Sequence, residues 1–411
     1  MTLDPRGPLA GRVVALAAAT LLTGGCGSGE AGSRTEARDS AGVTIVENRL
    51  PDDARLPWRV DPEPSLTIGT PDGPEPYQLY QVLGATRLSD GSIAVANAGT
   101  AELRVFGRDG EFIGAAGGQG GGPGEFRSMT LVGRLGGDSV LLYDGRARRF
   151  SVMAPGPAFA RSFGPGAGVG EGGLAAVGVL GTGAIAVQGP SAFPEGLAGG
   201  TVIAPARPLL VLTGGGGLEA VLDTFPTRPT LFESDGGFSF TLVPFTTGPA
   251  LAVGGGRVHV GPEQRYEVRS YDPRTGDLVR LTRLEREPRL VTDEDIGRAV
   301  EAAVDRAESD EAGARLRRSY AAMELPDTMP AHGRLLVDRP GNLWVEAYRA
   351  HGDELRLWTV FDPNGAVRGT VELPPDLYIF EIGEDWILGV ARDELDLPYV
   401  VVHGLERPTA E

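Results

Sequence analysis

Three consecutive stretches in the first third of the chain decide its fold: DGSIAVAN at residues 90–97, LRVFGRDGEFI at 103–113 and GQGGGPGEF at 118–126. In an extended strand, successive side chains of the first two stretches would point to opposite faces. The Asp-Gly pairs at 90–91 and 109–110 supply the positive φ that a tight hairpin needs. The block therefore predicts short antiparallel strands joined by tight turns.

The first strand of this block has five counterparts further along the chain. The central apolar residues of the six strands are Ile93, Val140, Ile185, Val258, Leu343 and Ile387. Their intervals are 47, 45, 73, 85 and 44 residues, and the two long intervals contain insertions. A unit that recurs about every 45 residues is typical of a radial or stacked repeat fold. The spacing therefore predicts six repeated units.

The block from 84 to 126 resembles an NHL-type β-propeller repeat, in which two strands and a D-G turn are followed by a glycine-rich bridge to the next blade. Residues 338–345 match the first-strand motif, and turns at 272–277 and 362–365 occupy the place of the D-G turn. The resemblance covers most of residues 43–406. It implies an all-β fold, a six-bladed β-propeller with a small helical insertion, similar to those of exported bacterial lipoproteins.

The segment from Val43 to Ile68 precedes the first full repeat. By the same resemblance, we expect it to supply a strand to the last blade, which would close the ring and remove exposed sheet edges. The resemblance is weak between residues 190 and 245. The expected propeller domain spans 43–406, and residues 407–411 are expected to form a C-terminal tail.

A helical insertion is expected at about residues 291–325, before the fifth blade. Thr292 and Asp295 form a helix start related to the capping box. Apolar residues then recur at four-residue spacing over 296–304, and a second helix is expected from Ala312 to Met323. The insertion is either a surface helical pair packed on a blade, or a lid or partner-docking element over one mouth of the ring.

The N-terminus has the pattern of an export signal. Its apolar run from Val13 to Thr23 is too short to span a bilayer, which needs roughly 20 residues, but it suits the centre of a signal peptide. The run leads into LTGGC at 22–26, which resembles the lipobox of bacterial lipoproteins. We therefore predict a signal peptide over 1–25, lipidation of Cys26 and a flexible tether over 26–42. The alternative is an ordinary secretory signal with an incidental cysteine.

Cys26 is the only cysteine in the chain, so it cannot form an internal disulfide. Acyl chains on its thiol would make the membrane a partner, through a lipid anchor. Gly27 and Ser28 follow it, and neither is the Asp that holds well-studied lipoproteins at the inner membrane. By this resemblance, the expected location is the cell envelope, at the periplasmic face of the outer membrane.

Charge and composition exclude several classes of function. All 38 basic residues are arginine, so a Schiff-base lysine, a P-loop lysine and a Ser-Lys dyad are ruled out. The formal net charge of −17 argues against a nucleic-acid partner, which would need a basic stripe.

Metal-ligating residues show no recognisable spacing. The four histidines, His259, His332, His351 and His403, form no His-x-x-x-His pair, so a closed zinc site is not expected.

Oxygen ligands lie near the ends of the first strands and make calcium a possible cofactor. Related six-bladed folds include lactonases that use Glu, Asn and Asp around calcium, and amidating lyases that use histidine-bound zinc. The alternative is that these residues form turns or are solvated. The oxygen-bearing candidates are Asn97, Asp144, Asp338 and Glu346.

Two classes of function remain, and no catalytic residue can be assigned. The first is a binding or scaffold module for a protein, peptide or glycan. The second is a metal (calcium)-dependent hydrolase or lyase with its site in the propeller channel. Convergent carboxylates in the channel would favour the enzyme, whereas apolar side chains or arginine there would favour binding.

Overall fold

The computed structural model describes residues 33–194, 196–234, 238–262 and 265–408. This part of the chain consists mostly of strands, with two α-helices and two short 3-10 turns, Glu75–Tyr77 and Gly136–Asp138. The prediction of a mostly-strand chain with a helical insertion is confirmed. Cys26 and the predicted signal peptide lie outside the described residues.

Six sheets follow one another along the chain; the first five contain four antiparallel strands in sequence order, and the sixth contains three, to which two N-terminal strands pair. The first sheet contains β5 (Val82–Arg87), β6 (Ile93–Asn97), β7 (Glu102–Phe106) and β8 (Phe112–Gly117). The second contains β9 (Met129–Arg134), β10 (Val140–Asp144), β11 (Arg149–Ala154) and β12 (Ala158–Phe163). The third contains β13 (Ala175–Val179), β14 (Ile185–Gln188), β16 (Ala206–Leu212) and β17 (Leu218–Pro226).

The fourth and sixth sheets include strands from the N-terminal segment. The fourth contains β20 (Ala250–Gly254), β21 (Arg257–Gly261), β22 (Glu267–Tyr271) and β23 (Leu278–Glu285), followed by β2 (Val43–Arg49) and β1 (Arg34–Ser40). The fifth contains β24 (Leu335–Val337), β25 (Leu343–Glu346), β26 (Arg356–Phe361) and β27 (Val367–Leu373). The sixth contains β28 (Tyr378–Ile382), β29 (Trp386–Arg392) and β30 (Pro398–Glu406), with β3 (Arg59–Val60) and β4 (Leu66–Ile68).

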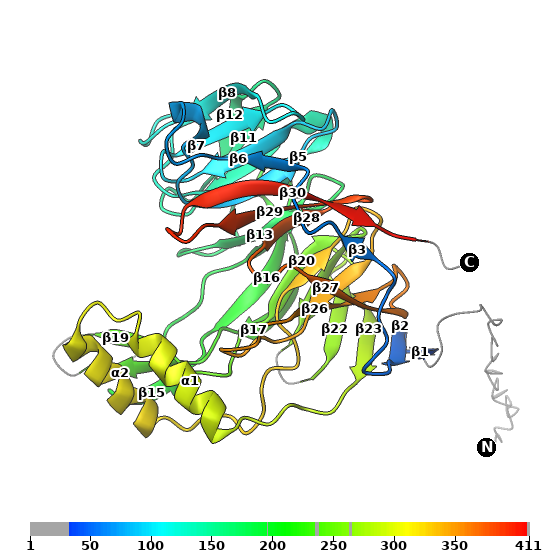
Figure 1. The fold of residues 1–411 in the computed structure, drawn as a ribbon, viewed down its shortest axis with the longest axis vertical. Coiled ribbons are helices and arrows are strands. Elements are labelled where there is room, and N and C mark those ends of the chain that lie inside the picture. Colours follow the sequence, from blue (N-terminus) through cyan, green and yellow to red (C-terminus); the bar gives the residue numbers. More distant parts are fainter. Residues whose placement is uncertain (1–32, 195, 235–237, 263–264, 409–411) are drawn as a thin grey trace, which may run out of the picture. The chain divides into compact units, whose positions relative to one another are not determined.

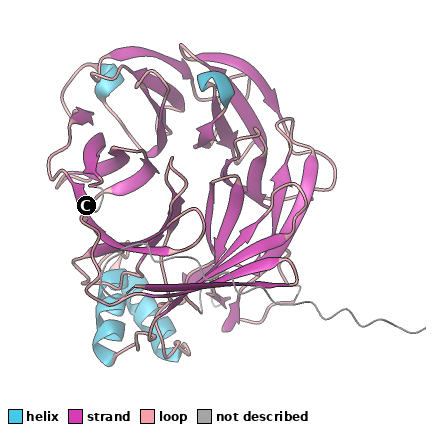
Figure 2. Cartoon of the chain, turned by 90° about the vertical axis from the view of Figure 1, so that its right-hand side faces the viewer, coloured by secondary structure: helices cyan, strands magenta, loops and turns pink. Residues whose placement is uncertain are grey.

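The first strands of the six sheets contact one another in a closed circuit. β5 contacts β9, and the contacts continue through β13, β20, β24 and β28 back to β5. An apolar cluster lies between each pair of neighbouring sheets, including the pair formed by the sixth and the first. Second strands such as β6 and β10 are therefore buried along their whole length. Figure 2 shows the sheets arranged around a central opening.

The N-terminal segment joins the last sheet, as expected. β4 pairs antiparallel with β30 through Leu66↔Val402 and Ile68↔Val400, and β3 pairs with the end of the same strand. Because the segment before the first sheet completes the sixth, the edge of β30 is covered by the chain itself.

The predicted tether over 26–42 is too long, because residues 34–40 form strand β1. β1 pairs antiparallel with β2, which pairs parallel with β23. All seven residues of β1 are exposed, so the segment carries no apolar periodicity, and its strand is held by the backbone ladder instead. At the C-terminal end, Arg407 forms an ion pair with Asp338 at 2.9 Å.

The helical insertion forms where the sequence predicts it. α1 (Asp293–Val304) begins with a complete capping box between Thr292 and Asp295, and α2 (Asp310–Ala322) follows it. Figure 1 shows the two helices beside β15 and β19. These strands belong to a seventh sheet formed by β15 (Thr201–Ile203), β18 (Thr230–Glu233) and β19 (Ser239–Leu242). Ser319 of α2 donates a hydrogen bond to Glu233 of β18 at 2.8 Å.

This seventh sheet was not predicted. It lies in the region between 190 and 245 where the repeat pattern is weak. Its strands are three or four residues long. In sequence, β15 is inserted between β14 and β16 of the third sheet, whereas β18 and β19 lie between the third and fourth sheets. Strands this short contain too few residues for a periodic pattern to show.

Candidate functional site

A cavity of about 1180 Å³ lies where the six first strands meet. Residues from β5, β9, β13, β20, β24 and β28 all line it, so every one of the six sheets contributes to the wall. Much of this wall is aliphatic or glycine, as in Leu131, Val179 and Leu336.

The charged residues of this channel are mostly basic. Five arginines and three carboxylates line it, a net charge of +2 in a chain whose formal charge is −17. The cavity therefore has the opposite sign to the protein as a whole. The charged residues are Arg134, Arg334, Arg339, Arg349, Arg392, Asp338, Glu346 and Glu381.

Three of the arginines lie at the mouth where the first strands begin. Arg334 directly precedes β24, Arg349 follows β25 and Arg392 ends β29. Arg392 forms an ion pair with Asp396 at 3.2 Å. Arg334 and Arg349 form no ion pair with any carboxylate in the described part of the chain. Neither guanidinium is in direct contact with a carboxylate, and the Glu346 carboxylate near Arg334 is ion-paired with Arg356 instead.

Both unpaired guanidinium groups are positioned by backbone carbonyls of one segment. Arg334 donates to the carbonyl of Ile379 at 2.9 Å, and Arg349 donates to the carbonyl of Pro375 at 3.1 Å. The Arg334 guanidinium also lies over the ring of Tyr378, 4.0 Å from its centroid. The start of β28 therefore orients Arg334, and the loop before it orients Arg349.

Arg334 retains hydrogen-bonding capacity. Its Nη1 is buried and forms no hydrogen bond within the described residues. Burial lowers the pKa of Arg334, and the nearby phenol of Tyr378 and carboxylate of Glu346 act in the opposite direction. A desolvated guanidinium gains most from an anionic acceptor, because charge-assisted hydrogen bonds are stronger than neutral ones. The mouth is therefore suited to a carboxylate or another planar anion.

The opposite mouth differs because its charges are paired. Arg134 pairs with Asp138 at 2.9 Å, and Arg339 pairs with Glu381 at 2.8 Å. Asp338 pairs with Arg407. The two charges within each pair neutralise each other, so the described residues at this end of the channel offer no comparable anion site.

The predicted calcium ligands are not brought together. Asn97 accepts the backbone N–H of Tyr80 at 2.7 Å, and Asp144 accepts three backbone N–H groups of its own sheet at 2.8–3.0 Å. Only Asp338 and Glu346 line the channel, at opposite ends of the β24–β25 hairpin. Throughout the described ranges, no group of three or more His, Cys, Asp or Glu side chains is placed to hold a metal ion. The four residues act in turns and ion pairs.

Three of the four histidines have structural partners, and His351 is exposed. His259 Nδ1 contacts Ser270 Oγ at 3.0 Å, His332 Nε2 contacts the Pro262 carbonyl at 3.1 Å, and His403 Nδ1 contacts the Asp61 carbonyl at 2.8 Å. Burial lowers the pKa of His259 to about 3, and the positive charge of Arg280 adds to the effect.

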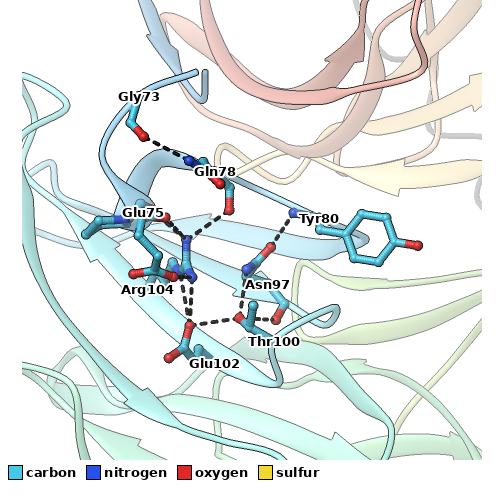
Figure 3. A network of polar contacts seen from close by, with 9 residues as sticks. Gly73, Glu75, Gln78, Tyr80, Asn97, Thr100, Glu102 and Arg104 are labelled. Carbon is cyan, nitrogen blue, oxygen red and sulfur yellow. Dashed lines mark hydrogen bonds and ion pairs between the residues drawn. The ribbon is translucent and has the colours of Figure 1, made fainter. Parts of the chain in front are cut away.

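Another polar network, outside the channel, surrounds the fully buried Arg104 (Figure 3). Its guanidinium donates to Glu75, to Glu102 and to three backbone carbonyls, those of Glu75, Pro76 and Gln78. All of its donors are thus directed at the segment before β5 and at its own strand. Arg104 therefore anchors the chain where it enters the first sheet and leaves no group for a ligand.

Sequence reasoning did not identify the mouth residues. Arg334, Arg349 and Tyr378 lie in segments that carry no recognisable motif, and Arg334 meets Tyr378 only because β24 and β28 belong to neighbouring sheets. A single arginine directly before a first strand is a weak signal, since arginine is common throughout this chain.

Comparison with known proteins gives no family. No family profile and no curated protein matches the sequence. Among solved structures, a protein of Bacteroides fragilis is 11% identical with a TM-score of 0.47, over 89% of this chain and 100% of that chain. A gluconolactonase of Xanthomonas campestris is 15% identical with a TM-score of 0.39, over 79% and 87%. Virginiamycin B lyase of Staphylococcus aureus is 9% identical with a TM-score of 0.40, over 85% and 99%.

These likenesses carry no argument about activity or location, because every TM-score is below 0.5 and no identity exceeds 15%. Among the described residues, no helix is long and apolar enough to cross a membrane.

Proposed function

We propose that this chain is an NHL-like six-bladed β-propeller lipoprotein that acts as a binding or scaffold module in the cell envelope. The closed circuit of six first strands, with an apolar cluster between each pair of neighbouring sheets, supports six blades. The sequence LTGGC at 22–26 supports a tether through Cys26, at the periplasmic face of the outer membrane. The proposed ligand is a protein, peptide or glycan.

The unpaired arginines at one mouth of the channel are the observation that carries the binding role. Arg334 lies over the ring of Tyr378, Arg349 donates to the nearby Pro375 carbonyl, and neither has a carboxylate partner among the described residues. A cationic mouth on an apolar channel binds an anionic group from solution more readily than it performs acid–base chemistry. The ligand therefore presents an anion, and a carboxylate fits the planar guanidinium best. No specific observation favours the metal-dependent hydrolase or lyase.

Arg334→Gln should weaken binding of an anionic probe by about 10- to 100-fold, because a charge-assisted hydrogen bond is worth about 1.5–3 kcal/mol. Isothermal titration calorimetry with hexaglutamate and with hexagalacturonate measures the effect and separates a peptide from a glycan. Arg108→Gln is the matched control, since it makes the same charge change at an exposed position. Failure of both probes to bind, or equal binding by the Arg334 variant, would refute the proposal.

Lipidation is tested independently of the ligand. Cells grown with radiolabelled palmitate should label the full-length protein, and Cys26→Ser should abolish the label because no other cysteine is present. Label that persists in Cys26→Ser would contradict the tether. An unlabelled but exported parent protein would favour the ordinary secretory signal.

A further inference from the structure

A second cavity, of about 860 Å³, lies beside the channel mouth. It is formed by the end of the fourth sheet, the stem of the helical insertion and the loop 347–355 after β25. Ala347 and Tyr348 line both this side cavity and the channel. The two cavities therefore share a wall two residues long.

The shared wall belongs to a loop that is held firmly. Arg349 lines the channel, whereas residues 352–355 line the side cavity. Arg289 in the stem binds Asp353 through two hydrogen bonds of 2.7 and 3.2 Å, and the Ala350 N–H donates to Asp353 at 2.8 Å. Ala350 also packs with Phe245 in an apolar cluster under α1. The helical insertion thus fixes the boundary between the cavities.

The side cavity has a mixed lining, with six carboxylates and four arginines (a net charge of −2) beside its apolar side chains, whereas the channel lining has a net charge of +2. Tyr266, Leu284 and Met329 are buried in its wall, and Leu355 is 58% exposed beside them. Its charged residues are partly matched, as in the pair of Arg283 with Glu267 at 2.7 Å. An apolar side chain with access to this wall would be removed from water, which is favourable in proportion to the area buried.

We infer that the ligand is a peptide that spans both cavities, with a carboxylate on Arg334 and a bulky apolar side chain in the side cavity. This inference rests on the proposed binding function. A single chain that binds the cationic mouth and also covers the apolar part of the side cavity, around Leu355, must carry both kinds of group within a few residues. A peptide does so, whereas an acidic glycan supplies the carboxylate without the apolar side chain.

A peptide series tests the inference on the whole protein. The probes are acetyl-Phe-Glyₙ-Glu peptides with zero to four glycines, together with the same peptides in which Gly replaces Phe, and affinity is measured by titration calorimetry. At one or more spacings the Phe peptide should bind at least about tenfold more tightly than its Gly counterpart, as burial of a large apolar side chain implies.

Leu355→Asp should abolish the gain from Phe and leave the Gly peptides bound as before. Ile113→Asp is the matched control, because Ile113 is 56% exposed on β8 and lies in neither cavity. If the Gly peptides bind but Phe adds nothing at any spacing, or if the gain survives in Leu355→Asp, the inference is overturned and the binding function stands. If no peptide binds, the proposal that the Arg334 site binds a peptide carboxylate is itself refuted.

Discussion

Arg104→Met should lower the free energy of unfolding by about 3 kcal/mol. The substitution keeps most of the side-chain volume but leaves the backbone carbonyls of Pro76 and Gln78 without the Arg104 donor, whereas that of Glu75 still accepts the Gln78 N–H. Each buried carbonyl without a donor costs about 1–3 kcal/mol of stability. Part of this cost is offset, because the variant no longer buries a charged guanidinium. Urea denaturation followed by tryptophan fluorescence measures the loss.

Arg108→Met is the control for this experiment, because it removes an arginine from an exposed turn of the same sheet. It should change the stability by less than about 0.5 kcal/mol. Adding Glu102→Gln to Arg104→Met should recover only part of the loss, since the carbonyls remain unsatisfied. A loss below about 1 kcal/mol in Arg104→Met would show that water replaces the guanidinium and that the network does not hold the segment before β5.

His259 should make the protein sensitive to mild acid. Its pKa lies at about 3 in the folded protein, whereas a solvated histidine titrates near 6.5. The unfolded chain therefore binds a proton that the folded protein does not, and the stability falls as the pH drops from about 6.5 towards 3. Between pH 7 and pH 4 this group alone removes about 3 kcal/mol.

The comparison of variants isolates this contribution from that of the carboxylates. The pKa values of Glu267, Asp295 and Asp353 are also lowered in the folded state, so protonation of these carboxylates in acid lowers the stability of the protein as well. His259→Gln should flatten the decline between pH 6.5 and 4, whereas His351→Gln, at an exposed site, should follow the parent protein. Parallel pH profiles for the parent and His259→Gln would contradict the buried neutral histidine.

Local chemistry accounts for the elements that sequence reasoning predicted correctly. The helix start at Thr292 was recognised because a cap requires residues three positions apart, and the structure has both of its hydrogen bonds. The strand around Ile93 was recognised because alternation and an Asp-Gly turn act within ten residues. The expected tether failed at β1, where exposed side chains conceal a strand that is held by backbone pairing to β2.

The candidate site could not be predicted in the same way. Asp338 and Glu346 were expected to converge, but the β24–β25 hairpin holds them at opposite ends. Arg334 and Tyr378 are 44 residues apart in sequence and meet because the fifth and sixth sheets are neighbours. Whether an arginine has a carboxylate partner depends on such long-range neighbours, so no local sequence motif predicts it.

By itself, the sequence determined the repeated strands, the turns between them, the helical insertion and an N-terminus with the pattern of an export signal. Each of these depends on interactions within a few residues or on composition. Only the tertiary structure decided which charges are paired, which cavities adjoin and which strands the N-terminal segment joins. The reason is that ring closure brings distant segments together, and the electrostatics of a buried group depend on all the groups that surround it.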